Sequence, residues 1–291
     1  MTPMKNITTF ILLFMIFFIC TQPLLKVKSD SKSELEVHFI DVGQGDSILI
    51  QTPTEKTILI DGGPPKAGKR VVDYLNKLGI KQIDLLIATH PDVDHIGGLK
   101  KVMKEVAVKQ VIDSGKLHFT NTYASYALEI RKQGIPIKVA KINEPILLDP
   151  DVKIKVLNAN SKNKTNNQSS LVLKVSYKEV DFLLMGDVEM EQEKTLLEKH
   201  NLEAEIVKIA HHGSDTSTSY QFLHEVNPQI AILTYRIGND YGHPVERVID
   251  NLDRIDAQIY STGVFGNLRI LTNGEDYMII PEKSPTENIA S

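Results

Sequence analysis

The chain has almost no cysteine, because Cys20 is the only thiol among its 291 residues. Cys20 lies inside an apolar run near the N-terminus, so the rest of the chain can form no disulfide and offers no thiolate ligand. Any metal site in that remainder must therefore be built from histidine, aspartate and glutamate.

Long apolar runs are absent after the first 25 residues, which argues against a membrane-spanning helix there. The run at 10–20 follows Lys5 and is shorter than the roughly 20 residues that a spanning helix needs. We expect residues 1–29 to be a secretory signal peptide with Val27 and Ser29 at the cleavage positions, and the alternative is a retained N-terminal membrane anchor. Both predict an extracytoplasmic protein, either secreted or associated with the membrane through this segment.

An excess of positive charge is absent as well. The whole chain has a net charge of −4, and residues 1–29 hold three lysines and no acid, so the remainder carries −7. This balance argues against broad electrostatic binding of a polyanion.

Apolar periodicity predicts a mixture of strands and helices. Residues 35–63 alternate or run apolar with β-branched side chains and turn residues between them, which predicts three strands. A helical face at 70–78 is followed by a short buried strand at 83–88. Further helices are expected at 120–135 and 191–200.

The plan of the first half recurs later in the chain. Residues 169–187 form a second apolar hairpin ending in an aspartate and a glycine-bearing turn, and a helix and a strand follow it. In this comparison Asp61 corresponds to Asp187, and His90 corresponds to His211. We therefore predict two similar half-domains whose strand-end loops line one shared edge, the alternative being a chance likeness between two hairpins.

The sequence IATHPDVDH at 87–95 places four lone-pair donors directly after a predicted strand: His90, Asp92, Asp94 and His95. All four suit a divalent cation, and a strand-to-loop junction can direct several of them at one point. Gathering such groups without a partner is costly, so the pattern favours a metal site over a structural role.

The string H-x-D-x-D-H resembles the H-x-H-x-D-H signature of the metallo-β-lactamase superfamily, with Asp92 at the place of the second histidine. Seven ordered segments within residues 36–275 are similar to the C-terminal β-lactamase-like domain of ComEC-type DNA-uptake proteins: FIDVGQGDSILI, IDGG, THPDVDHIGG, NNQSSLVL, LLMGD, KIAHHGS and YGHP. The long polytopic channel region of those proteins is not found here. The resemblance therefore implies a free-standing, exported version of that one domain.

The resemblance implies an α/β fold, a four-layer αββα sandwich built from two similar halves, over residues 30–280. The polar, proline-bearing segment 281–291 is expected to be a disordered tail.

The resemblance also implies a site for two divalent metal ions. It assigns His90 and Asp92 to one position, Asp94, His95 and His211 to the other, Asp187 as the bridging carboxylate and Asp61 as a hydrogen-bonding support. The superfamily supplies a further histidine from the middle of the chain, where this sequence offers only NNQSS at 166–170. A carboxylate at position 92 and the missing histidine make the first position rich in oxygen, which shifts the preference from zinc toward manganese or magnesium.

Two such cations can share a water and deliver hydroxide, and Asp94 and Asp187 would take part in catalysis through them. Phosphodiester cleavage suits this site, with His212, Ser214 and His243 as candidate donors to the substrate. Proline 244 is expected to open a helix whose N-terminus faces the same place. The structural alternatives are turn or helix caps for His212 and Ser214 and an exposed loop position for His243.

Three functions stay open on the sequence alone. The first is an exported metal-dependent nuclease or phosphodiesterase that acts on DNA and is linked to DNA uptake. The second is a hydrolase of a small acyl compound such as a lactone or thioester, which an acidic chain suits better than DNA does. The third is a catalytically weak envelope or uptake partner that binds nucleic acid or another protein.

Overall fold

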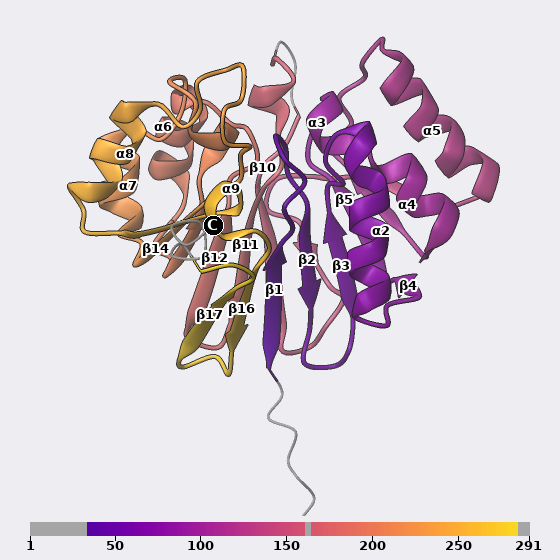
Figure 1. The fold of residues 1–291 in the computed structure, drawn as a ribbon, viewed down its shortest axis with the longest axis horizontal. Helices are drawn as coiled ribbons and strands as arrows, with labels where there is room; N and C mark the ends of the chain where they lie inside the picture. The colour runs from indigo at the N-terminus through magenta and orange to yellow at the C-terminus, as the bar shows by residue number, and fades with distance from the viewer. Residues whose placement is uncertain (1–33, 161–163, 285–291) are drawn as a thin grey trace, which may run out of the picture. The chain divides into compact units, whose positions relative to one another are not determined.

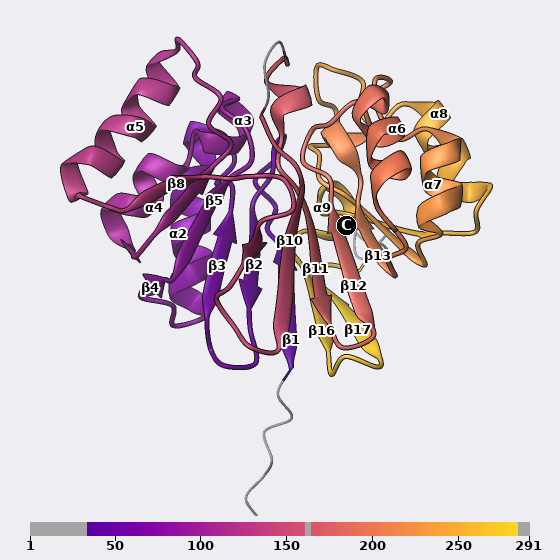
Figure 2. The ribbon, with the colours of Figure 1, turned by 180° about the vertical axis from the view of Figure 1, so that it is seen from behind.

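The computed structural model describes residues 34–160 and 164–284, and the predicted signal or anchor segment 1–29 lies outside this range. The described chain forms a four-layer αββα sandwich in which two sheets face each other and helices cover the outer face of each (Figures 1 and 2). The predicted fold class is confirmed. No helix in the described part is both long and apolar enough to cross a membrane.

The first sheet has eight strands in the order β17-β16-β1-β2-β3-β5-β7-β8. Its strands are β1 (Leu35–Phe39), β2 (Ile48–Gln51), β3 (Thr57–Ile60), β5 (Leu85–Ala88), β7 (Val111–Asp113), β8 (Ile137–Val139), β16 (Leu268–Thr272) and β17 (Tyr277–Pro281). The helices on its outer side are η1 (Pro65–Ala67), α2 (Gly68–Lys77), α3 (Val93–Ile96), α4 (Leu99–Glu105) and α5 (Asn121–Gln133). Two further short strands, β4 (Gln82–Ile83) and β6 (Ala107–Val108), pair with each other.

The second sheet has seven strands in the order β15-β14-β13-β12-β11-β10-β9. Its strands are β9 (Pro145–Ile146), β10 (Val152–Asn158), β11 (Val172–Tyr177), β12 (Val180–Leu184), β13 (Ile206–Lys208), β14 (Ile230–Leu233) and β15 (Gln258–Ser261). The helices that cover it are α6 (Met190–Lys199), α7 (Tyr220–Val226) and α8 (Glu246–Asp253). Three short elements complete the half: η2 (Asn167–Ser169), η3 (Ala210–Gly213) and α9 (Thr262–Phe265).

The two halves repeat one topology, as predicted. In each half an antiparallel hairpin, β2–β3 or β11–β12, leads through a helix into parallel strands. Ile58 of β3 lies opposite Leu85 of β5, and Phe182 of β12 lies opposite Ile206 of β13. Parallel strands end on the same side of a sheet, so the loops after β3, β5, β12 and β13 meet at the upper edge in Figure 1.

Alternating side chains build the layers. In β3, Ile58 and Ile60 point into the core between the two sheets, whereas Leu59 packs under the helices of the first half. The second half has its own core between helices and sheet, which includes Leu183 and Phe222. Because both faces of these strands are buried, their sequences are nearly continuous apolar runs.

The predicted disordered tail is wrong for its first residues. Pro281 ends β17, the Glu282 N–H donates to Asn267 O (2.8 Å), and the Lys283 N–H donates to Phe265 O (2.9 Å). Polarity suggested disorder, but the neighbouring β16 and α9 segments supply partners for these backbone groups. Residues 285–291 lie outside the described range.

Replacing Phe182 with alanine is expected to lower the free energy of unfolding by about 3–5 kcal/mol, because its fully buried ring lies between the two sheets. Urea denaturation followed by circular dichroism measures this loss. The control is Leu147→Ala at a side chain that is 87% exposed, for which a change within about 0.5 kcal/mol is expected. Equal losses for the two variants would contradict the layered core.

Candidate metal centre

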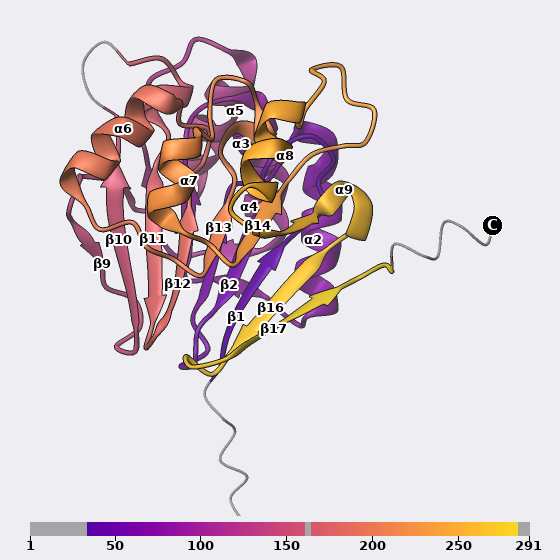
Figure 3. The same ribbon diagram turned by 90° about the vertical axis from the view of Figure 1, so that its left-hand side faces the viewer.

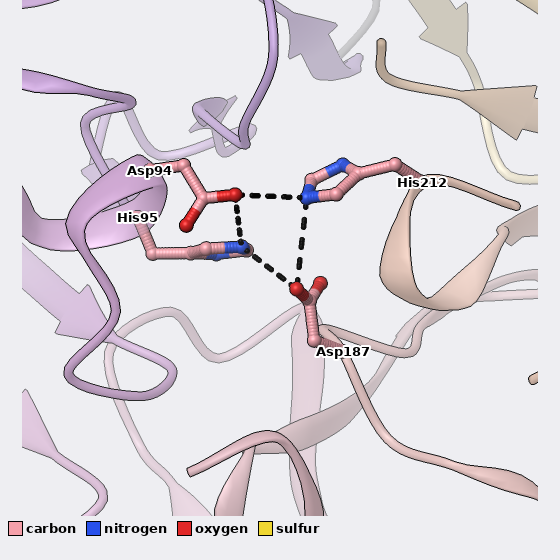
Figure 4. Close-up of side chains that lie close together, drawn as sticks. All are labelled: Asp94, His95, Asp187 and His212. Atoms are coloured by element: carbon pink, nitrogen blue, oxygen red, sulfur yellow. Dashed lines mark hydrogen bonds and ion pairs between the residues drawn. The ribbon is translucent and has the colours of Figure 1, made fainter. Parts of the chain in front are cut away.

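Four side chains from both halves meet at the shared edge: Asp94, His95, Asp187 and His212, hereafter the central cluster (Figure 4). One ligand atom from each lies within 4.8 Å of every other. His95 Nε2 is 3.1 Å from Asp187 Oδ2, and His212 Nε2 is 3.4 Å from Asp94 Oδ2. The four groups can therefore direct their lone pairs at one cation.

His90 and Asp92 lie directly beside the central cluster. His90 Nε2 is 3.5 Å from Asp92 Oδ2 and 3.7 Å from Asp187 Oδ2, and the rings of His90 and His95 are 4.0 Å apart. Asp187 thus lies between two groups of ligands, a position from which one carboxylate can bridge two cations.

Three buried atoms of this site have no hydrogen-bond partner among the described residues: His90 Nε2, His212 Nε2 and Asp187 Oδ1. Buried polar atoms are nearly always hydrogen-bonded, so unpartnered ones need an explanation such as an ion. The donor set of imidazoles and carboxylates fits two divalent cations. His90, Asp92 and Asp187 would hold one, and the central cluster would hold the other.

The outer nitrogens of the three imidazoles are held by groups behind them. His90 Nδ1 lies 3.1 Å from the Thr89 hydroxyl, and His212 Nδ1 lies 2.7 Å from Thr234 O. His95 Nδ1 lies 2.8 Å from Asp61 Oδ2, the support position that the sequence comparison gave to Asp61. Such contacts fix the ring orientation and leave Nε2 free to bind a cation.

The electrostatics of the central cluster favour a bound positive charge. Burial alone would raise the pKa of the Asp187 carboxyl, but His95 and His212 hold that pKa well below its usual range. Burial would lower the pKa of His95, yet Asp187 and Asp61 raise it well above its ordinary value. The pKa of His212 is also raised, against burial, by Asp187 and Asp94. A cation must displace the protons on these rings, so the affinity for metal should rise with pH.

The structure brings His212, and not the predicted His211, into the central cluster. The backbone passes through two successive left-handed residues here, His211 at φ 50° and His212 at φ 57°, which turn neighbouring side chains in different directions. His211 instead places Nε2 3.3 Å from Asn167 Nδ2 and Nδ1 3.1 Å from the Thr216 hydroxyl. The sequence comparison paired His211 with His90, whereas the left-handed turn brings the neighbouring His212 into the central cluster.

The other predicted donors lie outside the central cluster. Ser214 Oγ is 3.2 Å from the Thr216 hydroxyl, and the His243 ring lies edge-on to His211 with centroids 5.7 Å apart. The expected helix start at Pro244 is wrong, because α8 begins at Glu246. Val245 is still extended and its N–H donates to Gly213 O (3.0 Å), so the helix cannot begin earlier.

The polar segment NNQSS at 166–170 contacts the ligand group formed by His90 and Asp92. The Asn166 amide donates to Asp92 Oδ1 (2.6 Å) and lies 3.3 Å from His118 Nδ1. His118 belongs to none of the sequence motifs, and only the fold brings it to this place. Asn166 belongs to the NNQSS segment at 166–170, so this segment contributes an amide, and no histidine, next to Asp92.

A buried ion pair is linked to the central cluster through Thr234. Lys208 Nζ is 2.7 Å from Asp46 Oδ2, and both side chains are almost completely buried. Asp46 also accepts from the Thr234 hydroxyl (2.5 Å), and Thr234 O is the partner of His212. Burial raises the pKa of the Asp46 carboxyl, but Lys208 and His212 lower this pKa by more than burial raises it, so the carboxylate stays charged. The sequence shows Asp46 and Lys208 only as parts of a glycine turn and a strand.

Close backbone approach requires glycine at two positions near the ligands. A Cβ on Gly98 would lie 2.1 Å from Gly62 O, and a Cβ on Gly45 would lie 2.2 Å from Asp94 O. Because any larger residue would push these loops apart, the glycines let the loop after β3 and the turn after β1 touch the α3 region that carries Asp94 and His95.

The four-layer fold and its cluster of histidines and aspartates define the class of metal-dependent hydrolases. The chain belongs to the metallo-β-lactamase superfamily, whose family profile matches residues 40–235.

Its relatives include proteins named for competence. The chain is 31% identical to ComE operon protein 3 of Bacillus subtilis (strain 168), covering 81% of this chain and 33% of that protein. It is 29% identical to competence protein ComA of Neisseria gonorrhoeae, covering 82% of this chain and 32% of that protein. The chain thus spans about one third of the length of these curated relatives. The resemblance to ComEC-type proteins is confirmed.

A solved structure supports the fold independently. The metallo-beta-lactamase fold protein YhfI from Bacillus subtilis matches with a TM-score of 0.50 and 13% identity, covering 78% of this chain and 96% of that chain. At this identity the match shows a common fold.

Removing His212 is expected to weaken metal binding far more than removing His211. His212→Ala takes away a ligand atom of the central cluster and should lower the affinity for Mn²⁺ by at least about 100-fold. His211→Ala is the matched control and should change the affinity by less than about threefold, because its nitrogens face Asn167 and Thr216. Isothermal titration of EDTA-treated, dialysed protein measures both. A larger loss for His211→Ala would restore the assignment made from the sequence.

Removing one member of the buried ion pair is expected to destabilise the fold strongly. Lys208→Met leaves the Asp46 carboxylate buried without its cation and should lower the free energy of unfolding by about 3–5 kcal/mol. The double variant Asp46→Asn/Lys208→Met leaves no unpaired charge and should lose less. Urea denaturation in EDTA measures these two variants and the single variant Asp46→Asn. A loss for the double variant equal to the sum of the two single losses would contradict the pairing.

Proposed function

We propose that the protein is an extracytoplasmic, metal-dependent phosphodiesterase that cleaves DNA. The observation that carries this proposal is the position of Asp187 between two ligand groups, His90 with Asp92 on one side and the central cluster on the other. A paired site of this kind suits a reaction in which negative charge develops on several oxygens at once.

The two cations, when bound, supply a nucleophilic hydroxide and neutralise charge on the phosphate oxygens. The chain's own groups position the ligands and the substrate. Asp61 holds the Nδ1 proton of His95, and Thr234 O holds that of His212. Burial lowers the pKa of His243, which favours its neutral form. His243 Nδ1 has no hydrogen-bond partner among the described residues and can donate a hydrogen bond to a non-bridging phosphate oxygen.

The ligand set favours manganese or magnesium at the first position. Two carboxylates and one imidazole surround it, and the Asn166 amide donates a hydrogen bond to Asp92. Oxygen-rich sites prefer harder cations than zinc. The central cluster, with two imidazoles, suits zinc or manganese.

The acidic total charge does not oppose a polyanionic substrate, because the charge is divided unevenly. Residues 62–141, which include α2 to α5, contain fourteen basic and seven acidic residues. Residues 185–257, which include α6 to α8, contain six basic and fourteen acidic residues. A DNA backbone would therefore approach over the first half, where Lys100 and Lys104 of α4 are exposed.

The relatives support DNA as the substrate. ComE operon protein 3 and competence protein ComA carry names that refer to competence, and a further relative is recombination protein 2 of Haemophilus influenzae. The N-terminal segment 1–29, as a signal peptide or anchor, would place the enzyme outside the cytoplasm, where incoming DNA is met.

Nuclease activity of the full chain on labelled single-stranded and duplex DNA, with manganese, magnesium or zinc, tests the proposal. Cleavage with manganese is expected, and Asp94→Ala and Asp187→Ala should each reduce it by at least about 100-fold, since each removes a ligand and its charge. Glu225→Ala on the exposed side of α7 is the control that should leave cleavage unchanged.

Assays with lactones, thioesters and simple phosphodiesters distinguish DNA cleavage from the two other functions, acyl hydrolysis and a binding role. Hydrolysis of lactones or thioesters without cleavage of DNA or simple phosphodiesters would replace the proposal by acyl hydrolysis. Bound metal with no hydrolysis of either class would leave a binding role.

A further inference from the structure

A row of four rings leads from the solvent to the central cluster. The Tyr241 ring is stacked on the His243 ring, with centroids 5.7 Å apart and planes inclined by 26°. His243 meets His211 edge-on at 5.7 Å, and His211 meets His212 at 6.2 Å. Since His212 belongs to the central cluster, Tyr241 forms the outer end of a ring-lined path to the ligands.

Tyr241 is open to the solvent. It is 69% exposed, although its ring is one of the chain's few aromatic groups. It lies in the loop between β14 and α8, which rises at the upper edge of the second half in Figure 3.

The loop that carries Tyr241 is held by its own hydrogen bonds. The Asn239 side-chain oxygen accepts from the backbone N–H of Tyr241 (3.0 Å) and of His243 (3.1 Å). The Asn239 amide donates to Arg236 O (2.9 Å) and His243 O (2.5 Å). The Arg236 N–H donates to Gln44 Oε1 (3.3 Å), which ties the loop to the first half. The ring is therefore presented from a fixed loop, as a recognition surface requires.

We propose that Tyr241 stacks on a nucleobase of single-stranded DNA, next to the phosphodiester that lies at the central cluster. The inference rests on the proposed function and specifies its substrate. Every base has a π face, so an exposed aromatic ring beside a phosphate site recognises a strand without reading its sequence. Bases in a duplex are already stacked on each other, so the contact favours single strands and frayed ends.

A nucleobase can stack on Tyr241 only where it is not stacked inside a duplex. The phosphate is bound by groups other than Tyr241. His243 lies between Tyr241 and His211, and its Nδ1 has no hydrogen-bond partner among the described residues, so it can meet a phosphate oxygen. A strand bound in this way places one of its bases on Tyr241 and one of its phosphodiesters at the central cluster, with His243 and His211 between them.

The test compares substrates with and without bases. Full-length wild type, Tyr241→Phe and Tyr241→Ala are assayed for kcat/KM on an oligothymidylate and on an oligomer of the same length made only of abasic residues. Tyr241→Ala should lose about tenfold on oligothymidylate and less than twofold on the abasic oligomer. Tyr241→Phe should match the wild type on both, because the ring without its hydroxyl still stacks.

Binding without cleavage provides a second readout. In EDTA, an oligonucleotide that contains 2-aminopurine should be quenched on binding to wild type and Tyr241→Phe, and quenched much less on binding to Tyr241→Ala. Equal losses on both oligomers, or no loss on either, overturn the inference and leave the phosphodiesterase proposal intact. If wild type cleaves neither oligomer, the proposed function fails, and the quenching alone decides: dependence on Tyr241 supports stacking, and unchanged quenching overturns it.

Discussion

The Asp187 carboxylate is the group on which the site depends. It is buried and faces the Nε2 atoms of three imidazoles, from His90, His95 and His212. A buried carboxylate is costly unless positive groups and hydrogen bonds surround it. The imidazoles come from both halves of the chain, so the charge of Asp187 is balanced only when the two sheets are packed face to face. Fold and site are thus linked by one electrostatic requirement.

Local backbone strain and a scaffold of hydrogen bonds place the ligands. Asp61, His211 and His212 all have left-handed conformations, which cost about 1–3 kcal/mol each in non-glycine residues. The surrounding contacts offset this cost. Behind the histidine pair, the Arg247 guanidinium reaches from α8 to Asp215 and to the carbonyls of Ser217 and Thr218. The buried ion pair of Lys208 and Asp46 fixes the end of β13, so the strained turn at His211 and His212 has little freedom to relax.

The two halves share a topology but differ in chemistry. The part of the first half that includes α2 to α5 carries an excess of basic residues, whereas the part of the second half that includes α6 to α8 is acidic. The loops of the second half present the row of rings that ends at Tyr241. A polyanion and a nucleobase need different surfaces, one charged and one aromatic. A duplicated fold supplies both, because strand-end loops with the same position can diverge in composition while the sheets remain alike.

The sequence by itself determined the strands, the helices and the duplication, and the family resemblance predicted the four layers and most of the side chains that meet at the shared edge. Hairpins, helices and buried strands follow from periodicity between neighbouring residues, and the string at 90–95 collects its donors within one turn. Only the tertiary structure decided that His212 replaces His211, that Asn166 and His118 stand beside Asp92, and that Lys208 pairs with Asp46. The reason is physical: a left-handed turn redirects adjacent side chains without changing composition. Contacts such as Asp46 with Lys208 join positions far apart in the chain, where no local pattern acts.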